Sequence, residues 1–484
     1  MQRILFIVLI GINIHTLLAQ KPIDSLGIKE DFKIFESILK KGHPSLYEYI
    51  NQDSLDYLFK TTKESLSNDS TDIDLYKKML QITSTIKDGH LLLFAPNSIK
   101  SDQYYFPLIL KIINTNLYTD TDDFGIPVGS KIKLINGKKV SKILERLKKY
   151  AASDGNNLTG KYRNIELKFG LYFAYEYGIE KQFIVEYTTP AGEDKKTTVI
   201  AESFVKVKLR NTKRNSYFAQ YHKQKNGFDF FNKFIGNKDP FVYYKNELNT
   251  AILVVNSFGG DIGIFKSNLT RIFKEINKKK VRHLIIDVRN NDGGFRPNAI
   301  HLFSFLTKNV FKQITSEYVI SLSVPEREYA TRTFLNEKQF LKEKFENHPI
   351  YDGWKLTFDD METIMVPDKN RFKGKVYVLA GGATFSAGST FTLNVKNDPD
   401  MTLIGEETGG GYYFLNGEFP VYYEFPNSKI SMVMSMEKIS NYVKDKTIPK
   451  GSGVPPDKHI KLSIEDLIKG KDPQLDYIFR LIGG

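Results

Sequence analysis

The second half of the chain alternates short apolar runs with longer amphipathic stretches, and this alternation constrains the fold more than any other feature. The apolar runs are rich in β-branched residues and lie at 251–255, 283–288, 376–380 and 401–405. Stretches with helical spacing separate them, at 265–278, 297–306 and 387–395. Strands that alternate with helices form a mainly parallel sheet covered by helices. We therefore expect an α/β fold over residues 248–470.

The composition is typical of a globular protein with two to four domains. The chain has 484 residues, of which 41% are hydrophobic and 26% charged, enough for a sizeable core. These values exclude a disordered chain, a collagen-like fibre and a polytopic membrane protein. The net charge of +13 is a mild excess over this length, so we expect no nucleic-acid partner.

The sequence contains no cysteine. Disulfides, zinc–thiolate sites, iron–sulfur clusters and a cysteine nucleophile are therefore excluded. It also lacks the His-Glu-x-x-His spacing of a metallopeptidase, and we expect neither a metal nor another cofactor. Chemistry at a site must then come from serine, histidine, carboxylates and the backbone.

Residues 1–19 resemble a cleaved signal peptide. Arg3 supplies a positive start, 4–12 form an apolar segment, and 17–19 offer a cleavage site before Gln20. The alternative is an uncleaved membrane anchor. The apolar segment is shorter than a spanning helix, which favours cleavage and leaves no stable membrane span.

Export and the absence of cysteine together indicate a compartment. Exported eukaryotic proteins commonly carry disulfides, whereas this chain cannot form one. A lipoprotein anchor also requires a cysteine. We therefore expect a protein of the bacterial periplasm or a secreted bacterial protein.

The region between the leader and the α/β part divides into three segments. Residues 20–100 are expected to be helical: 71–74 resemble a capping box, and the apolar residues behind it share one stripe (Leu75, Met79, Ile82 and Ile86). Residues 101–205 change to strand periodicity, with an Asn-Gly turn at 136–137. Residues 206–247 are expected to be a basic linker, with an anion-binding patch as the alternative. Residues 471–484 are expected to be a C-terminal tail.

Two loops follow predicted parallel strands and lead into helices. The first is Asp-Val-Arg-Asn-Asn-Asp-Gly-Gly at 287–294, and the second contains Gly-Gly-Ala-Thr-Phe-Ser-Ala at 381–387. Such loops gather along one edge of an open α/β sheet, where sites are usually built. We also expect Asp287 to cap its strand or to pair with Arg289.

Ser386 is a candidate nucleophile because it lies where the second loop enters its helix. The N–H of Ala387 would face a developing oxyanion, and Gly293 or Gly294 could donate the partner N–H. From spacing alone, an N-cap serine remains the alternative for Ser386. A simple turn remains the alternative for the two glycines.

The order of these motifs resembles the tail-specific and tricorn-type serine peptidase family, which includes the interphotoreceptor retinoid-binding proteins. The shared pieces are Asp88-Gly89-His90, a PDZ-like stretch at 129–140, the 287–294 signature, Ser386-Ala387, the Gly-rich stretch at 405–410, and Gly-Val-Pro-Pro-Asp at 453–457. The resemblance covers about residues 30–470. It implies a ClpP/crotonase-like core, an N-terminal helical region and a PDZ-like β-rich insertion. It also implies that Gly409 and Gly410 contact substrate.

The departures from this family bear on the catalytic base. The Ser–Lys branch carries its lysine at a position that is Gly411 here. The resemblance to the tricorn-like branch implies that His90 acts as the base instead. That branch has a supporting glutamate where this chain has Lys450, and neither Glu437 nor Asp445 aligns with it convincingly.

The resulting hypothesis is an exported serine endopeptidase that cleaves peptides or unfolded protein tails. Ser386 is the expected nucleophile and His90 the general base. The rival is a non-catalytic peptide- or small-ligand-binding protein on the same scaffold, and an esterase would use the same groups. The oligomeric state stays open, with a homo-oligomer as one alternative, and residues 310–370 are either a lid or an oligomer contact.

Overall fold

The computed structural model describes residues 25–67, 69–96, 103–216, 239–334, 336–347, 353–356 and 364–483. The expected signal peptide at 1–19 lies outside these ranges. Among the described helices, none combines the length and the apolar content that crossing a bilayer requires.

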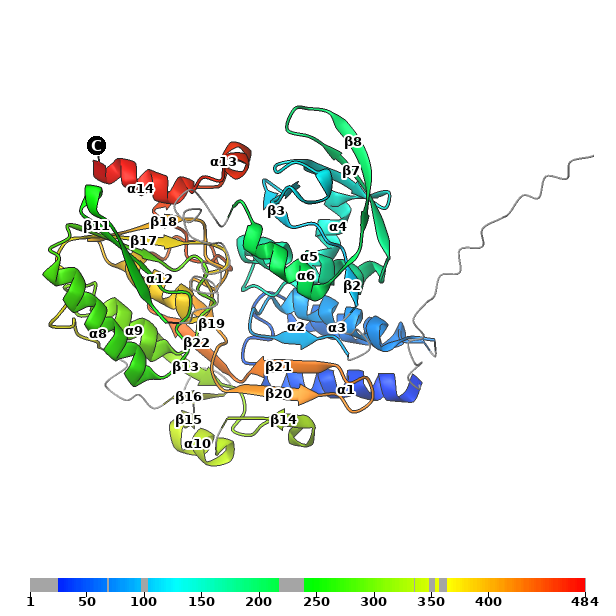
Figure 1. Cartoon of the computed structure of the whole chain (residues 1–484). Helices are drawn as coiled ribbons and strands as arrows, with labels where there is room; N and C mark the ends of the chain where they lie inside the picture. Colours follow the sequence, from blue (N-terminus) through cyan, green and yellow to red (C-terminus); the bar gives the residue numbers. More distant parts are fainter. Residues whose placement is uncertain are drawn as a thin grey trace, which may run out of the picture.

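A six-stranded sheet forms the centre of the C-terminal half (Figure 1). Its strands, in spatial order, are β10 (Phe241–Lys245), β11 (Thr250–Val254), β12 (His283–Asp287), β17 (Lys375–Ala380), β18 (Met401–Gly405) and β23 (Lys458–His459). β10 pairs antiparallel with β11, and the other neighbours are parallel. The expected mainly parallel sheet is confirmed. Its edge strand β10 falls inside the segment expected to be a linker.

Successive strand residues point to opposite sides of this sheet, so its apolar runs give it two apolar faces. Helices cover both of them. Ala251 and Leu253 pack in the core that includes α8 (Ile262–Lys278), α9 (Arg296–Ser304) and α12 (Ala387–Asn397). Ile252 and Val254 pack instead with α14 (Pro473–Gly483), which follows the short helix α13 (Ile464–Lys469). The segment 471–484, expected to be a tail, is thus largely a core helix.

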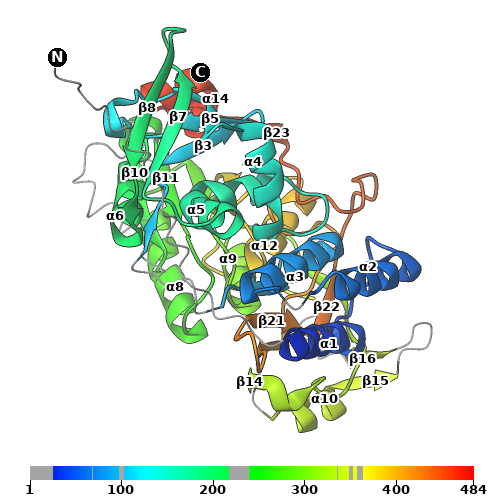
Figure 2. The ribbon, with the colours of Figure 1, turned by 90° about the vertical axis from the view of Figure 1, so that its right-hand side faces the viewer.

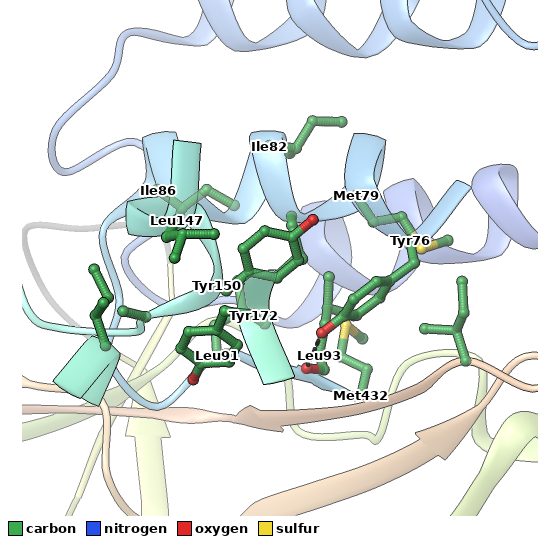
Figure 3. Close-up of a cluster of buried hydrophobic side chains, with 14 of the residues drawn as sticks. Tyr76, Met79, Ile82, Ile86, Leu91, Leu93, Leu147, Tyr150, Tyr172 and Met432 are labelled. Carbon is green, nitrogen blue, oxygen red and sulfur yellow. Dashed lines mark hydrogen bonds between the residues drawn. The ribbon is translucent and has the colours of Figure 1, made fainter. Parts of the chain in front are cut away.

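Three helices build the N-terminal region, as expected: α1 (Ser25–Gly42), α2 (Gln52–Glu64) and α3 (Asp72–Ile86). Thr71 and Asp74 form the capping box at the start of α3. Figure 3 shows the apolar face of α3 against Leu147 and Tyr150, which belong to the next region. The capping box and the buried stripe therefore fix how α3 packs.

The next region is an antiparallel sheet with two helices. Its strands are β3 (Leu110–Ile113), β4 (Asn116–Thr119), β5 (Lys131–Ile135), β6 (Lys138–Lys139), β7 (Gln182–Thr188) and β8 (Asp194–Ile200). The helices are α4 (Val140–Leu147) and α5 (Thr159–Tyr177). A small pair, β2 (Tyr104–Tyr105) and β9 (Glu202–Ser203), precedes the short helix α6 (Phe204–Arg210).

Part of the basic segment is buried rather than solvated. Arg214 is 1% exposed and forms an ion pair of 3.0 Å with Asp120. Its guanidinium also donates to the carbonyls of Leu110 and Glu166. The expectation of a solvated linker is wrong here, because this arginine ties the antiparallel region together.

Two further sheets connect the N-terminal helices with the core (Figure 2). The first contains β15 (Phe345–Asn347), β16 (Trp354–Leu356), β13 (Ile314–Val319), β22 (Glu437–Asn441) and β19 (Phe414–Leu415) in that order. The second contains β1 (Leu92–Phe94), β21 (Ser431–Ser435), β20 (Pro420–Glu424) and β14 (Ala330–Arg332). With helix α10 (Glu337–Lys344), much of the segment 310–370 is therefore part of the fold.

Candidate active site

Ser386 lies on a sharp turn between β17 and α12. The turn is held in place by its neighbour loop: the Phe385 N–H donates to the Asn291 carbonyl, and the Thr384 hydroxyl donates to the Val288 carbonyl. The backbone of Ser386 has φ 53° and ψ −126°, a conformation that L residues rarely adopt. Such strain clusters at functional sites.

The Ser386 side chain does not cap α12. Ser386 occupies the N-cap position of the helix, as the alternative reading of the sequence had it, but its side chain makes no capping hydrogen bond. The Oγ of Ser386 instead lies 3.0 Å from Nε2 of His90, which comes from a loop 296 residues earlier in the chain. This distance is within hydrogen-bond reach of a nucleophile and its base.

His90 follows the end of α3, where Lys87 adopts the left-handed conformation that terminates the helix. The His90 ring stacks on Phe385, with 4.6 Å between ring centroids and 30° between planes. The imidazole is therefore held against the same turn that presents Ser386.

Asp88 is the carboxylate nearest to the other side of His90. Its Oδ1 accepts the His90 backbone N–H at 2.8 Å and lies 3.9 Å from His90 Nδ1. Its Oδ2 accepts from His43 Nε2 at 2.9 Å and from Asn416 Nδ2 at 3.0 Å. Burial favours a higher pKa for Asp88, but the hydrogen bond from His43 and the two nearby imidazoles hold that pKa below its ordinary value.

The hydrogen bonds of His43 assign its proton, whereas the tautomer of His90 follows from the role proposed for it. His43 Nδ1 accepts the Ser45 N–H, so His43 carries its proton on Nε2, which points to Asp88. For His90 to accept a proton from Ser386, Nε2 must be free and Nδ1 protonated. That Nδ1 is buried and has no hydrogen-bond partner within the described residues. A shift of about 1 Å would bring it within hydrogen-bond distance of Asp88.

Asp154 braces this site from a third segment of the chain. Its two oxygens accept the N–H groups of Gly89 at 2.7 Å and Gly411 at 2.9 Å. Burial, followed by the nearby Asp88 charge, raises the pKa of Asp154 to about 7. A Cβ at Gly411 would collide with the Phe414 carbonyl, so this position could not hold the lysine of a Ser–Lys dyad without backbone movement.

Asp88, His90 and Asp154 form a grouping that could in principle hold a metal ion. All four of their carboxylate oxygens, however, already accept hydrogen bonds from N–H donors. These bonds, together with the contact of His90 Nε2 with Ser386 Oγ, account for the grouping as a hydrogen-bonded network.

The two candidate oxyanion glycines differ in their surroundings: Gly293 packs against Ser386, and Gly294 packs against Phe258. A Cβ at Gly293 would lie 2.6 Å from the Cβ of Ser386, so only glycine fits there. The N–H of Gly293, however, donates to Asn291 Oδ1 at 2.9 Å. Gly294 bridges to Phe258 through bonds made by its neighbours, the Gly293 carbonyl and the Phe295 N–H. The Gly294 N–H is therefore the better candidate to act with Ala387.

Gly409 and Gly410, expected to contact substrate, are buried beneath the Ser386 turn. The Gly409 N–H donates to the Thr384 carbonyl, and the Gly410 N–H donates to Ser389 Oγ. Their N–H groups are thus used inside the protein. The two glycines support the turn by close packing.

Lys450 does not take the place of a residue supporting His90. Its ammonium pairs with Glu48 at 2.6 Å and is 61% exposed on its side chain. Glu48 also pairs with Lys438. The other two acids do not support His90 either. The backbone carbonyl of Asp445 accepts a hydrogen bond from the Tyr412 hydroxyl, and the side chain of Glu437 is buried near Glu317 and Arg296. Asp88 is the acid beside His90 that the sequence analysis missed, although it stands two residues away in the motif.

We expect Lys450→Ala to leave kcat/KM within about twofold of the wild-type value, because an exposed ion pair contributes little. Lys450→Glu should slightly lower Tm, since the new carboxylate would face Glu48. Steady-state kinetics and thermal melts test both changes. Loss of most activity in Lys450→Ala would identify a lysine base and contradict the assignment of His90 as the base.

The expected pairing of Asp287 is confirmed. Both of its oxygens accept from the Arg289 guanidinium, which also pairs with Asp472. This pair fixes the first residues of the 287–294 loop at the edge of the sheet.

A serine on a strained strand-to-helix turn, a histidine at 3.0 Å and nearby backbone N–H donors define a serine hydrolase arrangement. Residues 249–460 match the model of peptidase family S41. The chain thus contains a serine-type peptidase domain of family S41. His90 lies outside the matched segment. No curated protein matches the sequence significantly.

The fold is similar to solved structures at low sequence identity. Mature CPAF complexed with lactacystin shares 15% identity at a TM-score of 0.63, over 95% of this chain and 98% of that chain. Mature CPAF alone gives 13% identity and a TM-score of 0.62, over 95% and 96% of the two chains. The photosystem II D1 C-terminal processing protease gives 13% and 0.43, over 94% and 97%. The similarity to CPAF establishes a shared fold that extends beyond the matched family segment.

Proposed function

We propose that this protein is an exported serine endopeptidase that cleaves peptides or unfolded protein tails, with Ser386 as nucleophile and His90 as base. The observation that carries the proposal is the 3.0 Å contact between Ser386 Oγ and His90 Nε2. Its support is the conformation of Ser386, whose side chain is free of any capping role.

In the proposed mechanism, Ser386 Oγ attacks the peptide carbonyl while its proton moves to His90 Nε2. The new imidazolium is stabilised by Asp88, which His43 and Asn416 hold in position. His90 then returns the proton to the departing amine. Water repeats the cycle on the acyl-enzyme and releases the second product.

The oxyanion of the tetrahedral intermediate would be bound by the N–H groups of Ala387 and Gly294. Ala387 begins α12, so the positive end of the helix adds to the N–H bond. Preorganised donors of this kind lower the barrier because they need no reorientation as charge develops.

The antiparallel region that holds β3 to β8 is the proposed PDZ-like part. There a peptide would add to an exposed strand edge and pair through its backbone.

Cleavage of residues 1–19 and release into the periplasm or medium complete the proposal. Its support is the sequence of that segment alone.

The pH dependence follows from His90. Burial lowers the pKa of His90 below its ordinary value of 6.5, and the Asp88 charge opposes this shift. Only neutral His90 can accept the Ser386 proton, so activity should fall as the pH drops through this pKa. We expect the acid limb of kcat/KM to have its midpoint below 6.5 and activity to stay high at mildly alkaline pH. A limb centred near about pH 8 would instead indicate a lysine base.

The test is cleavage of an unfolded protein by the mature chain that begins at Gln20. Mass spectrometry should detect internal fragments with the wild type and none with Ser386→Ala. Peptide binding without any fragment would support the non-catalytic rival and overturn the proposal.

A further inference from the structure

A cluster of four charged side chains lies next to the candidate active site. Arg296 begins α9, two residues after Gly294. Glu418 follows Gly417, and a Cβ at Gly417 would lie 3.5 Å from His90 Nε2. The cluster is therefore anchored to both the oxyanion loop and the loop that faces the base.

The other two members come from neighbouring strands. In the β13–β22 ladder, Glu317 lies opposite Ile439, and Glu437 lies opposite Val319 (Figure 1 labels both strands). Residues opposite each other, and residues two apart on one strand, share a face. Glu317 and Glu437 are therefore diagonal neighbours on one buried face, 2% and 0% exposed.

Charge within this four-residue cluster is not balanced. Arg296 forms ion pairs with Glu317 and with Glu418, the latter at 3.3 Å. The carboxyl of Glu437 is fully buried against the carboxyl of Glu317, and neither of its oxygens receives an N–H or hydroxyl donor within the described residues. Burial, followed by the charges of Glu317 and Glu418, raises the pKa of Glu437 well above its ordinary range, and Arg296 opposes the shift.

A buried carboxyl whose only polar partner is a second carboxyl is costly unless another group supplies a donor. Glu418 is the route by which such a group could arrive, because its side chain is 35% exposed while the other three are nearly buried. The cluster is acidic in a chain whose net charge is +13. A cation would supply both the missing charge and the missing donors.

We propose that Glu418, Glu317 and Glu437 form a subsite for a cationic group of the peptide substrate, an ammonium or a guanidinium, next to the scissile bond. This inference rests on the proposed peptidase function. The cation would enter past Glu418 and donate hydrogen bonds to the carboxyls beneath. Glu437, protonated in the empty subsite, would release its proton to solvent as the cation binds.

Hydrolysis provides the first test. Blocked fluorogenic peptides would carry a single lysine at successive positions on either side of the cleaved bond, with norleucine peptides as matched controls. We expect lysine to raise kcat/KM by about tenfold or more at one position. Glu418→Gln should bring this ratio towards one, whereas the control Glu424→Gln, which changes a half-buried glutamate of β20, should not. An unchanged ratio in Glu418→Gln, or no lysine preference at any position, would overturn the subsite.

Binding provides a second test that does not need turnover. Calorimetry of the Ser386→Ala chain with the lysine and norleucine peptides, in two buffers of different ionisation enthalpy, should show tighter lysine binding and proton release. Glu437→Gln should abolish the proton release. Peptides with a free or an acetylated N-terminus distinguish a side-chain cation from an α-ammonium. Equal affinities overturn the subsite even if the chain proves inactive, and inactivity with selective binding overturns only the peptidase proposal.

Discussion

Replacing Ser386 by alanine should reduce peptide hydrolysis by roughly a millionfold, the loss typical of removing a serine nucleophile. In the proposed mechanism, the Oγ that contacts His90 is the attacking atom. The fold should be unaffected, because the side chain makes no capping hydrogen bond whose loss would cost stability. Progress curves with a fluorogenic peptide measure the first effect, and thermal melts measure the second.

Ser386→Gly separates catalysis from backbone strain. At φ 53° and ψ −126°, glycine avoids the backbone strain that serine or alanine bears. The free energy of unfolding of this variant should therefore be about 1 kcal/mol higher. It should be as inactive as Ser386→Ala. Ser141→Ala, an exposed serine on α4, is the control that should stay fully active. Substantial hydrolysis by either Ser386 variant would refute the assigned nucleophile.

His90→Ala should reduce hydrolysis about as far as Ser386→Ala. The double variant should be little worse than either single one, because nucleophile and base act as one unit. His459→Ala, which removes an exposed histidine of β23, should keep normal activity. Additive losses in the double variant would indicate that His90 acts on something other than Ser386.

Much of the catalytic core could be predicted because its signal is local and periodic. The four apolar runs after residue 250 match β11, β12, β17 and β18 closely. Parallel strands end at one edge, so the 287–294 loop and the Ser386 turn had to come together there. His90 came from family resemblance alone, since it is separated from Ser386 by 296 residues and no periodicity joins them.

The support around His90 could not be predicted, because it depends on buried hydrogen bonds between distant segments. Asp88 joins His43 to Asn416 across intervals of 45 and 328 residues. Asp154 joins Gly89 to Gly411 in the same way. Such contacts leave no pattern in a single sequence, and only the closeness of Asp88 to His90 in the motif hinted at its position.

The C-terminal helix was missed for a different reason. The segment 471–484 is short and follows the α/β pattern, so it resembled a tail. Its apolar residues Leu475 and Ile478 are buried against the sheet face opposite α8. A sheet with two apolar faces needs a cover on each, and that requirement is the signal that could have predicted α14.

The most direct measurement is labelling with a fluorophosphonate probe, followed by peptide mapping of the modified residue. The probe reacts only with a serine that a neighbouring base activates. We expect a single adduct on Ser386 in the wild type and almost none in His90→Ala, while His459→Ala labels normally. An adduct on another serine, no adduct in the folded wild type, or unchanged labelling of His90→Ala would contradict a Ser386–His90 catalytic pair.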